Sequence, residues 1–244
     1  MKSKFIVFLM MVCVLFTLSA VSAADNQTDV ISDEGDSHTF TDLKNDLNNS
    51  GDVFEVQHNY KYCDDDNFIG RIIIEKNMTI NGNDHVIENL TGKYVLVFDS
   101  TGNINVNNLT FKNCFDASIM INSNVVFNNV QFINCSGFKQ TGDIYVEDNF
   151  IQVTSKDMTF NNCVFQMNPG NYSAIVCNYG SLTVNNSLFN KGDFLKGCLF
   201  VNRADFIVEN TTFANMSSSF ATAINYKAGI LQLETQNSLI CIPV

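Results

Sequence analysis

Carboxylates are the side chains in this sequence that are best suited to chemistry. The densest acidic stretch is "CDDDN" at 63–67, where three consecutive aspartates offer the oxygen ligands that Ca²⁺ prefers. Asp64, Asp65 and Asp66 lack the alternate spacing and the glycine of a calcium-binding loop, which favours a solvated surface loop. They are the only candidates for a metal site, and no cofactor is expected.

The other acidic residues do not form a pattern typical of catalysis. Glycoside hydrolysis needs two carboxylates at a defined separation on one exposed face. The exposed candidates are not expected to share one phase of the repeat described below; they are Asp99, Asp116, Asp143, Glu147, Asp157, Asp193 and Asp205. The three histidines are scattered along the chain, and neither arginine is accompanied by an acidic cluster. We therefore expect no catalytic residues, with a carbohydrate-active enzyme as the alternative.

A repeated segment organises most of the chain and must position these side chains. "INVNNLTFKNC" (104–114) is followed by "VVFNNVQFINC" (125–135), "MTFNNCVFQMN" (158–168), "LTVNNSLFNKG" (182–192) and "FIVENTTFANM" (206–216), and "MTINGNDHVIEN" (78–89) is a weaker copy. Successive copies are 25, 21, 33, 24 and 24 residues apart, and the long interval contains an inserted loop at 136–153. A period of this length is typical of a solenoid.

Two positions define each repeat. The second residue of the asparagine pair is predicted to turn a corner and to form an amide ladder: Asn83, Asn108, Asn129, Asn162, Asn186 and Asn210. Three residues later come the predicted core-stack residues: Val86, Phe111, Phe132, Phe165, Phe189 and Phe213. Apolar residues alternate on both sides of the corner, which is typical of strands. The sequence therefore predicts an all-β protein, a single-stranded right-handed parallel β-helix.

The repeat also brings two cysteines to equivalent positions. Cys114 and Cys135 each stand three residues after the repeated phenylalanine, in adjacent copies 21 residues apart. Stacked coils lie about 4.8 Å apart, which is within the Cα separation of a disulfide. We expect these cysteines to be neighbours, and both a disulfide and a pair of buried thiols are open alternatives.

The N-terminal residues have the composition of an export signal. Residues 1–23 combine Lys2 and Lys4 with a long apolar run and small residues before Ala24, which predicts cleavage at that point. Residues 24–36 are predicted to be an acidic flexible linker. The mature chain is therefore expected to be secreted or at the cell surface.

A capping helix and the β-helix are predicted to follow. Over residues 37–52, the side chains of Phe40, Leu43 and Leu47 share one helical face, so a short amphipathic helix there would cover the first coil. The β-helix is expected over 53–244, with a C-terminal end that is either truncated or covered by a partner.

Charge and composition exclude some partners. The formal net charge of −11 at pH 7 repels phosphate backbones, so nucleic acid is not expected as a partner. No segment after the signal is apolar for long enough to span a membrane. Among the N-x-[ST] sequons, Asn26 and Asn48 are the favoured glycosylation candidates because the others lie within packed coils.

The N-terminal part of the chain resembles a known family. "TFTDLKNDLNN" followed by "GRIIIEKNMTING" resembles the opening of adhesin-like β-helix surface proteins of methanogenic archaea, in the pectate-lyase-like superfamily. The motif residues are Gly70, Ile74, Lys76, Thr79, Ile80 and Gly82, and the resemblance extends over about residues 37–216. It implies an archaeal cell-surface protein that binds extracellular glycans or other cell surfaces without catalysis. A truncated remnant of a larger adhesin is a further alternative.

Overall fold

The alternating apolar segments fold as short strands that pair in parallel with the equivalent segments of neighbouring coils. The computed structural model describes residues 37–63, 68, 70–91, 95–115, 118–136, 151–153, 156–171, 173–194, 197–218 and 223–234. These residues belong to one unit, Asp36–Val244. The predicted signal (1–23) and linker (24–36) lie outside the described residues, as does most of the inserted loop.

The described strands form three parallel sheets, here named A, B and C. Sheet A contains β1 (Ser37–His38), β3 (Asn59–Lys61), β6 (Val86–Glu88), β9 (Thr110–Lys112), β12 (Gln131–Cys135), β15 (Val164–Met167), β16 (Pro169–Asn171), β19 (Leu188–Phe194) and β22 (Thr212–Ser218). Sheet B contains β2 (Val53–Glu55), β5 (Met78–Asn81), β8 (Asn103–Asn107), β11 (Asn124–Asn128), β14 (Lys156–Asn161), β18 (Gly180–Asn185), β21 (Asp205–Glu209) and β24 (Leu231–Glu234). Sheet C contains β4 (Ile72–Ile74), β7 (Leu96–Phe98), β10 (Ile119–Ile121), β13 (Ile151–Val153), β17 (Ile175–Cys177), β20 (Leu199–Val201) and β23 (Ile224–Tyr226).

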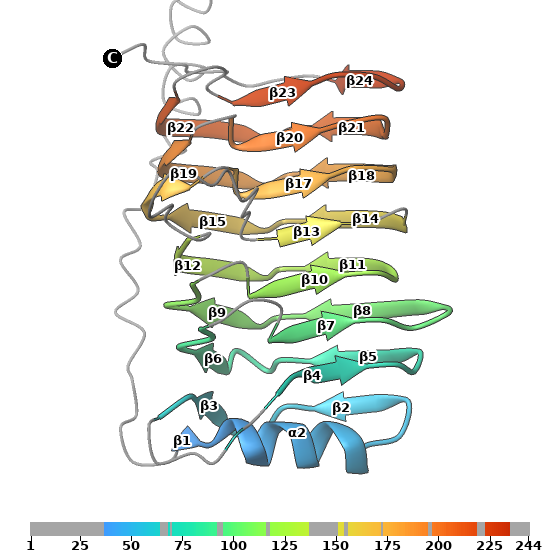
Figure 1. The fold of residues 1–244 in the computed structure, drawn as a ribbon, viewed down its shortest axis with the longest axis vertical. Helices are drawn as coiled ribbons and strands as arrows, with labels where there is room; N and C mark the ends of the chain where they lie inside the picture. The colour runs from blue at the N-terminus through green and yellow to red at the C-terminus, as the bar shows by residue number, and fades with distance from the viewer. Residues whose placement is uncertain are drawn as a thin grey trace, which may run out of the picture. The chain divides into compact units, whose positions relative to one another are not determined.

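Successive coils stack along the long axis of this unit, from β2 at one end to β24 at the other (Figure 1). The chain passes from sheet B to sheet A and then to sheet C before it returns to sheet B one coil further on. The predicted parallel β-helix is therefore confirmed.

The corner between sheets B and A depends on asparagine. All six predicted corner residues have positive φ, between 45° and 54°, a conformation that asparagine tolerates better than most residues. A second set of asparagines with positive φ lies on sheet A, directly after β6 and β9 and within β12 and β22; it comprises Asn89, Asn113, Asn134 and Asn215. Asparagine thus provides both of these bends, and the strands between them stay in register.

Phenylalanine side chains stack inside the coils. The rings of Phe111, Phe132, Phe165, Phe189 and Phe213 are parallel to within 14°, with successive centroids 5.4, 4.7, 4.3 and 5.0 Å apart. A second stacked pair, Phe127 and Phe160, packs edge-on against Phe132. Close packing of these buried rings holds successive coils together.

The first member predicted for this stack is corrected by the register. Phe111 pairs with Ile87, whereas the predicted Val86 pairs with Thr110. Asn81 and Asn107 are paired across sheet B, so this corner contains two more residues than the corner of the next coil. The longer corner shifts the following strand by one residue. Ile87, and not Val86, is therefore the residue paired with Phe111 at the first position of the stack.

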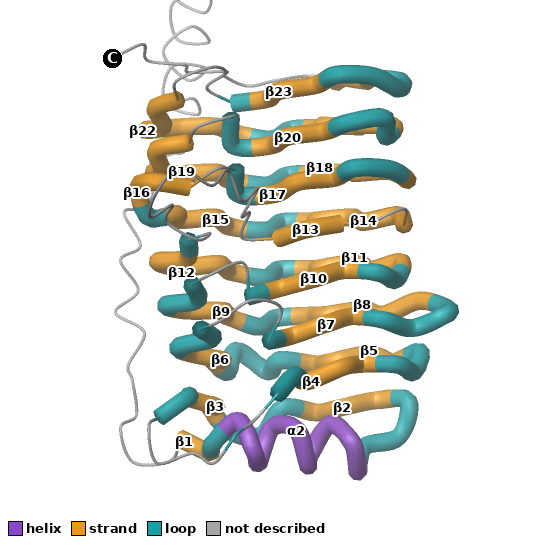
Figure 2. The backbone as a smooth tube through the Cα atoms, viewed as in Figure 1, coloured by secondary structure: helices purple, strands orange, loops and turns teal. Residues whose placement is uncertain are grey.

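A short helix covers the first coil, as predicted. Helix α2 (Phe40–Asn49) begins with a capping box, in which the Thr39 hydroxyl accepts from the Asp42 N–H (3.2 Å) and the Asp42 carboxylate accepts from the Thr39 N–H (2.9 Å). Its buried side chains are those of Phe40, Leu43 and Leu47. Figure 2 shows this helix in purple at the β2 end of the stacked coils.

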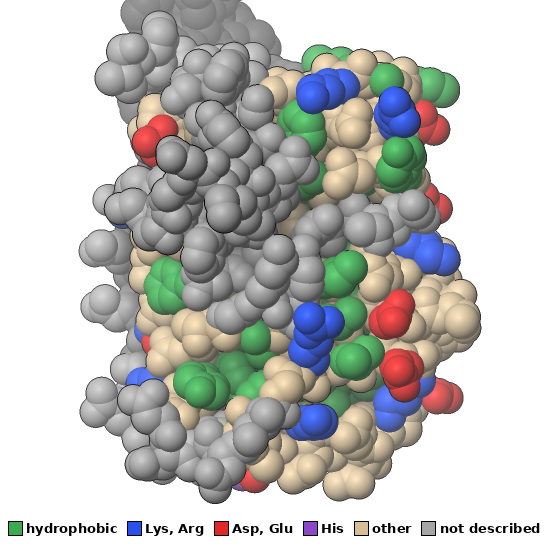
Figure 3. All heavy atoms as spheres, viewed as in Figure 1, with side chains coloured by type: hydrophobic (Ala, Val, Ile, Leu, Met, Phe, Trp, Pro, Cys, Tyr) green, Lys and Arg blue, Asp and Glu red, His purple; other side chains and the backbone are tan. Residues whose placement is uncertain are grey.

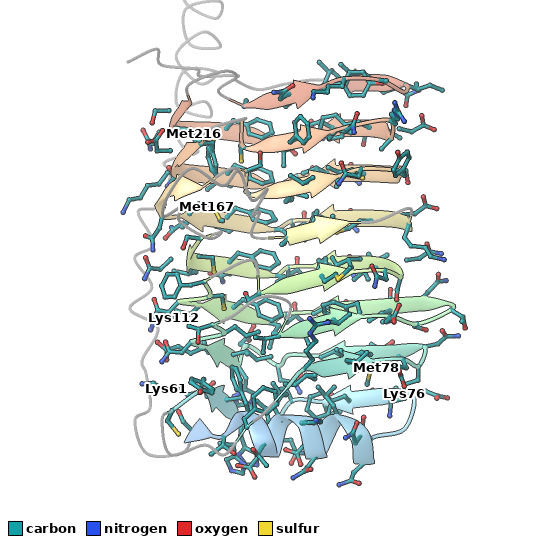
Figure 4. The ribbon with its side chains drawn as sticks, in the orientation of Figure 1. Lys61, Lys76, Met78, Lys112, Met167 and Met216 are labelled. Atoms are coloured by element: carbon teal, nitrogen blue, oxygen red, sulfur yellow. The ribbon has the colours of Figure 1, made fainter. Side chains whose placement is uncertain are left out.

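A lysine between β4 and β5 forms hydrogen bonds with the C-terminal end of this helix. The ammonium group of Lys76, labelled in Figure 4, donates to the backbone oxygens of Leu47 (3.1 Å) and Ser50. The last carbonyls of a helix have no partner within the helix, and a cation there also complements the helix dipole. The Tyr60 hydroxyl adds a hydrogen bond to Asp46 at 2.7 Å. These bonds join α2 to the coils that it covers.

Candidate functional site

The outer face of sheet B presents regular rows of polar side chains. Alternate residues of a strand point to opposite faces of the sheet, so Ile104 and Val106 of β8 are buried while Asn105 and Asn107 reach the surface. The register is kept from strand to strand, and each outward position therefore forms a row along the stack.

One of these rows is a continuous hydrogen-bonded column of asparagines. Each Nδ2 donates to the side-chain oxygen one coil nearer the capped end: Asn81 to Glu55 (2.6 Å), Asn107 to Asn81 (3.0 Å), Asn128 to Asn107 (2.8 Å), Asn161 to Asn128 (2.9 Å) and Asn185 to Asn161 (3.0 Å). We call these five asparagines the asparagine column. Hydrogen bonds from Asn81 and then Asn83 lower the pKa of the Glu55 carboxyl, because they stabilise its ionised form.

The residues predicted for the ladder lie beside this column, at the corners. Asn129 Nδ2 donates to Asn108 Oδ1 at 3.1 Å, but the described residues provide no side-chain partner for Asn162, Asn186 and Asn210. These three side chains are exposed at the corner. The preceding residue ends the strand and keeps its amide in register with its neighbours.

A second amide row on sheet A was not predicted. Asn134 Nδ2 donates to Asn113 Oδ1, and Asn113 Nδ2 donates to Glu88 at 2.7 Å. Lys112, labelled in Figure 4, also lies 3.7 Å from the Glu88 carboxylate. The recurring "NC" after each phenylalanine at 113–114 and 134–135 was the signal for this row.

Two of the exposed carboxylates share one register position, contrary to the sequence expectation. Asp157 on β14 pairs with Ser181 on β18, which pairs with Asp205 on β21. The Ser181 hydroxyl donates to Asp157 Oδ1 at 2.8 Å. The expectation that these carboxylates fall at different phases is therefore wrong for Asp157 and Asp205, which lie two strands apart in one row.

A tyrosine and an arginine lie at the same corner, between sheets C and B. Tyr179 precedes β18, is 45% exposed, and accepts at its hydroxyl a hydrogen bond of 3.4 Å from Arg203, which precedes β21. We call Asp157, Tyr179, Ser181, Arg203 and Asp205 the corner cluster. On the face shown in Figure 3, basic and acidic side chains gather along this edge of the coils. The cluster combines an aromatic ring, a cation and hydroxyl and carboxylate groups on an exposed edge.

The remaining acidic candidates do not add to this cluster. Asp193 lies on sheet A, where its carboxylate accepts from the Ser217 hydroxyl at 2.9 Å, and Asp99 lies at the end of β7. Six candidates lie outside the described residues: Asp64, Asp65, Asp66, Asp116, Asp143 and Glu147. Within the described ranges, no three His, Cys, Asp or Glu side chains are grouped in a way that could hold a metal ion.

The histidines lie at or near the capped end. The rings of His38 and His58 stack with centroids 3.9 Å apart and an interplanar angle of 8°, and Tyr60 packs edge-on against His38. His85 Nδ1 lies 3.4 Å from Asn59 Oδ1 on the neighbouring strand. These contacts are part of the packing of the first two coils, away from the corner cluster.

The six cysteines within the described residues are free thiols. Cys114 and Cys135 are buried neighbours, and burial, followed by their mutual hydrogen bond, raises the pKa of the Cys114 thiol. Of the two alternatives for this pair, the structure has the buried thiols. Burial also raises the pKa of Cys163 to about 12. A neutral thiol is a poor nucleophile, so these residues act as small apolar side chains.

The glycosylation candidates divide between described and undescribed residues. Asn48 is exposed near the end of α2, and Ser50 of its sequon donates its hydroxyl to the Leu47 carbonyl. Asn26 lies outside the described residues. The exposed side chain of Asn48 is compatible with the predicted modification.

Comparison with protein-family models, with curated proteins and with solved structures finds no match to this chain. No helix among the described residues is both long enough and apolar enough to cross a bilayer. Function is therefore inferred from the parallel β-helix, the corner cluster and the asparagine column.

Proposed function

We propose that this protein is an exported, adhesin-like β-helix that binds extracellular glycans, free or on other cell surfaces, without catalysing a reaction. The observation that carries the proposal is the corner cluster, where an exposed tyrosine lies among polar groups on successive coils. The resemblance of residues 37–216 to adhesin-like surface proteins of methanogenic archaea favours the same function.

The chemistry of the corner cluster suits a sugar. The exposed face of the Tyr179 ring offers an apolar surface for a pyranose, and its hydroxyl is oriented by Arg203. Asp157 and Ser181 provide an acceptor and a hydroxyl for hydrogen bonds with sugar hydroxyls. The net charge of −11 disfavours polyanionic chains. Neutral glycans are therefore the expected ligands.

The stacking of the coils favours a polymer over a single sugar. Asp157, Ser181 and Asp205 repeat at the strand spacing of about 4.8 Å, so similar groups recur along a line. A polysaccharide lying along that line would contact several coils at once, and its weak contacts would add.

A glycan array followed by calorimetric titration tests this function. Tyr179→Ala should weaken binding of the best neutral glycan by about tenfold, which corresponds to ~1.4 kcal/mol. Ile73→Ala is a matched control, because Ile73 is also 45% exposed but lies on sheet C outside the corner cluster. If the array detects no glycan, or if Tyr179→Ala binds as tightly as the wild type, the proposal fails.

A carbohydrate-active enzyme is the second candidate, and the Asp157–Asp205 row favours it. Two strand spacings separate their backbones by about 9.6 Å. Inverting glycosidases hold their carboxyl groups about 6.5–9.5 Å apart. An assay for new reducing ends separates the two functions. If the wild type releases product and both Asp157→Asn and Asp205→Asn do not, the protein is a hydrolase and the proposal of a binding protein without catalysis fails.

A further inference from the structure

The asparagine column has a direction. Every side-chain amide in it donates toward the capped end, and Asn81, Asn107, Asn128 and Asn161 also accept from the coil on the other side. At the capped end the series closes on an acceptor, because the Glu55 carboxylate receives hydrogen bonds from Asn81 and Asn83. A column of this kind is complete only if its opposite end meets a donor or a cation.

The opposite end meets neither among the described residues. Asn185 Oδ1 is shielded from solvent and has no hydrogen-bond partner. The next residue in its row is Glu209 on β21, paired with Asn185 across sheet B. An ionised carboxylate only accepts hydrogen bonds, so it cannot complete the column. The register therefore places an acidic residue, rather than a donor or a cation, next to the unpartnered amide oxygen.

The surroundings do not supply the missing charge. The described residues form no hydrogen bond or ion pair with the Glu209 side chain. The register then places Glu234 of β24 next in the same row, which is a further acidic position at this end of the column. A buried carbonyl oxygen without a hydrogen-bond partner destabilises the folded state.

We propose that a hard divalent cation, Ca²⁺ in the first place, binds at this end of the asparagine column between Asn185 Oδ1 and the Glu209 carboxylate. Amide and carboxylate oxygens are the ligands that Ca²⁺ prefers, and water completes its coordination. The shielded, unpartnered Asn185 oxygen is the observation that distinguishes this site from other acidic positions on the surface. With two identified protein ligands, the site falls in the weak class, with a dissociation constant of about 0.1–1 mM.

The ion would link the β18 and β21 coils, which lie near the β24 end of the stack (Figure 1). It would extend the hydrogen-bonded column by one step, from amide–amide contacts to amide–cation–carboxylate contacts. Binding to the folded form alone stabilises it, and at 10 mM Ca²⁺ the melting temperature should rise by roughly 3–11 °C over this range of dissociation constants.

The test is thermal melting and calorimetric titration of the full chain, first freed of metal with EGTA and then titrated with CaCl₂. Glu209→Gln is the decisive variant, because the glutamine amide can donate to Asn185 Oδ1 and complete the column without an ion. This variant should melt at a higher temperature than the metal-free wild type and should show no response to Ca²⁺.

Glu55→Gln is the matched control at the other end of the column, and it should keep the full Ca²⁺ response. The proposal is overturned if the metal-free wild type does not respond to Ca²⁺, or if Glu209→Gln still responds. It is equally overturned if the wild type ignores Ca²⁺ but gains stability on acidification, since a proton on Glu209 would then be the missing donor.

Discussion

Phe165→Ala tests whether the stacked rings hold the coils together. The Phe165 ring lies between those of Phe132 and Phe189, with centroid distances of 4.7 and 4.3 Å, and Phe160 packs edge-on at 5.2 Å. The side chain is completely buried. Truncation therefore removes three aromatic contacts at once and leaves a cavity between two coils.

The expected cost is large for a single substitution. A buried phenylalanine replaced by alanine typically costs 3–5 kcal/mol, and the three ring contacts place Phe165 at the upper end, about 5 kcal/mol. Phe213 stacks on one ring only among the described residues, at 5.0 Å from Phe189, so Phe213→Ala should cost about 3 kcal/mol. For a domain of this length, the Phe165 variant should melt about 10–20 °C lower.

Urea denaturation followed by far-UV circular dichroism measures both variants, with Ile73→Ala as an exposed control expected within 0.5 kcal/mol of the wild type. The m-value must be compared as well, because a solenoid can lose its coils in separate steps. A loss below 1 kcal/mol for Phe165→Ala would refute the stacked core. Equal losses for Phe165→Ala and Phe213→Ala would refute the ranking by number of ring contacts.

Three further predictions concern the cap, a corner and pH. Lys76→Met should lower the free energy of unfolding by about 1–3 kcal/mol in urea denaturation, because the carbonyls of Leu47 and of the C-cap residue Ser50 lose their charged donor. Gly82→Ala should lower the melting temperature, because its Cβ would lie 2.3 Å from a backbone oxygen, whereas Gly51→Ala has open space and should not. Burial raises the pKa of Cys163 to about 12 and that of Cys177 to about 11, against 9.0 for an unburied thiol. The stability contributed by these neutral thiols is complete below pH 9 and should fall as the pH rises through these values, as urea titrations at about pH 8 and pH 11 would show.

The fold was predictable because each coil of a solenoid contacts only its neighbours. The recurring Asn-Asn-x-x-Phe pattern therefore contained both the corner and the core position, and Phe111 to Phe213 stack as the alignment indicates. The cap was predictable for a local reason, since the Thr39–Asp42 capping box and the apolar face of α2 both lie within residues 39–47.

The coil that contains β5 and β6 was harder to align because its corner is longer. "NGNDHVIE" contains two extra residues between the paired strands, and a sequence alignment on the asparagine cannot tell where they are accommodated. The positive φ of both Asn83 and Asp84 shows that they widen the corner. The result is a shift of one residue, from Val86 to Ile87, in the strand that follows.

The amide column and the carboxylate row were both present in the sequence. Alternate residues of a strand point to opposite faces, so the buried Ile104 and Val106 place Asn107 outward. The same alternation identifies the first asparagine of each pair as the column residue. Asp157, Ser181 and Asp205 each stand five residues before a corner asparagine, which gives them one phase. What the sequence could not supply is the direction of the hydrogen bonds, because it depends on how each amide is oriented by its neighbours.

Alternation along the strands also separates stability from binding. Inward positions carry the phenylalanine stack, and outward positions carry the corner cluster and the asparagine column. Tyr179→Ala removes an exposed ring and should leave the free energy of unfolding within about 0.5 kcal/mol of the wild type, while Phe165→Ala should destabilise the fold strongly. Glu209→Gln is the informative exception, because it changes an outward residue and yet is expected to stabilise the fold, by completing a column that runs from coil to coil.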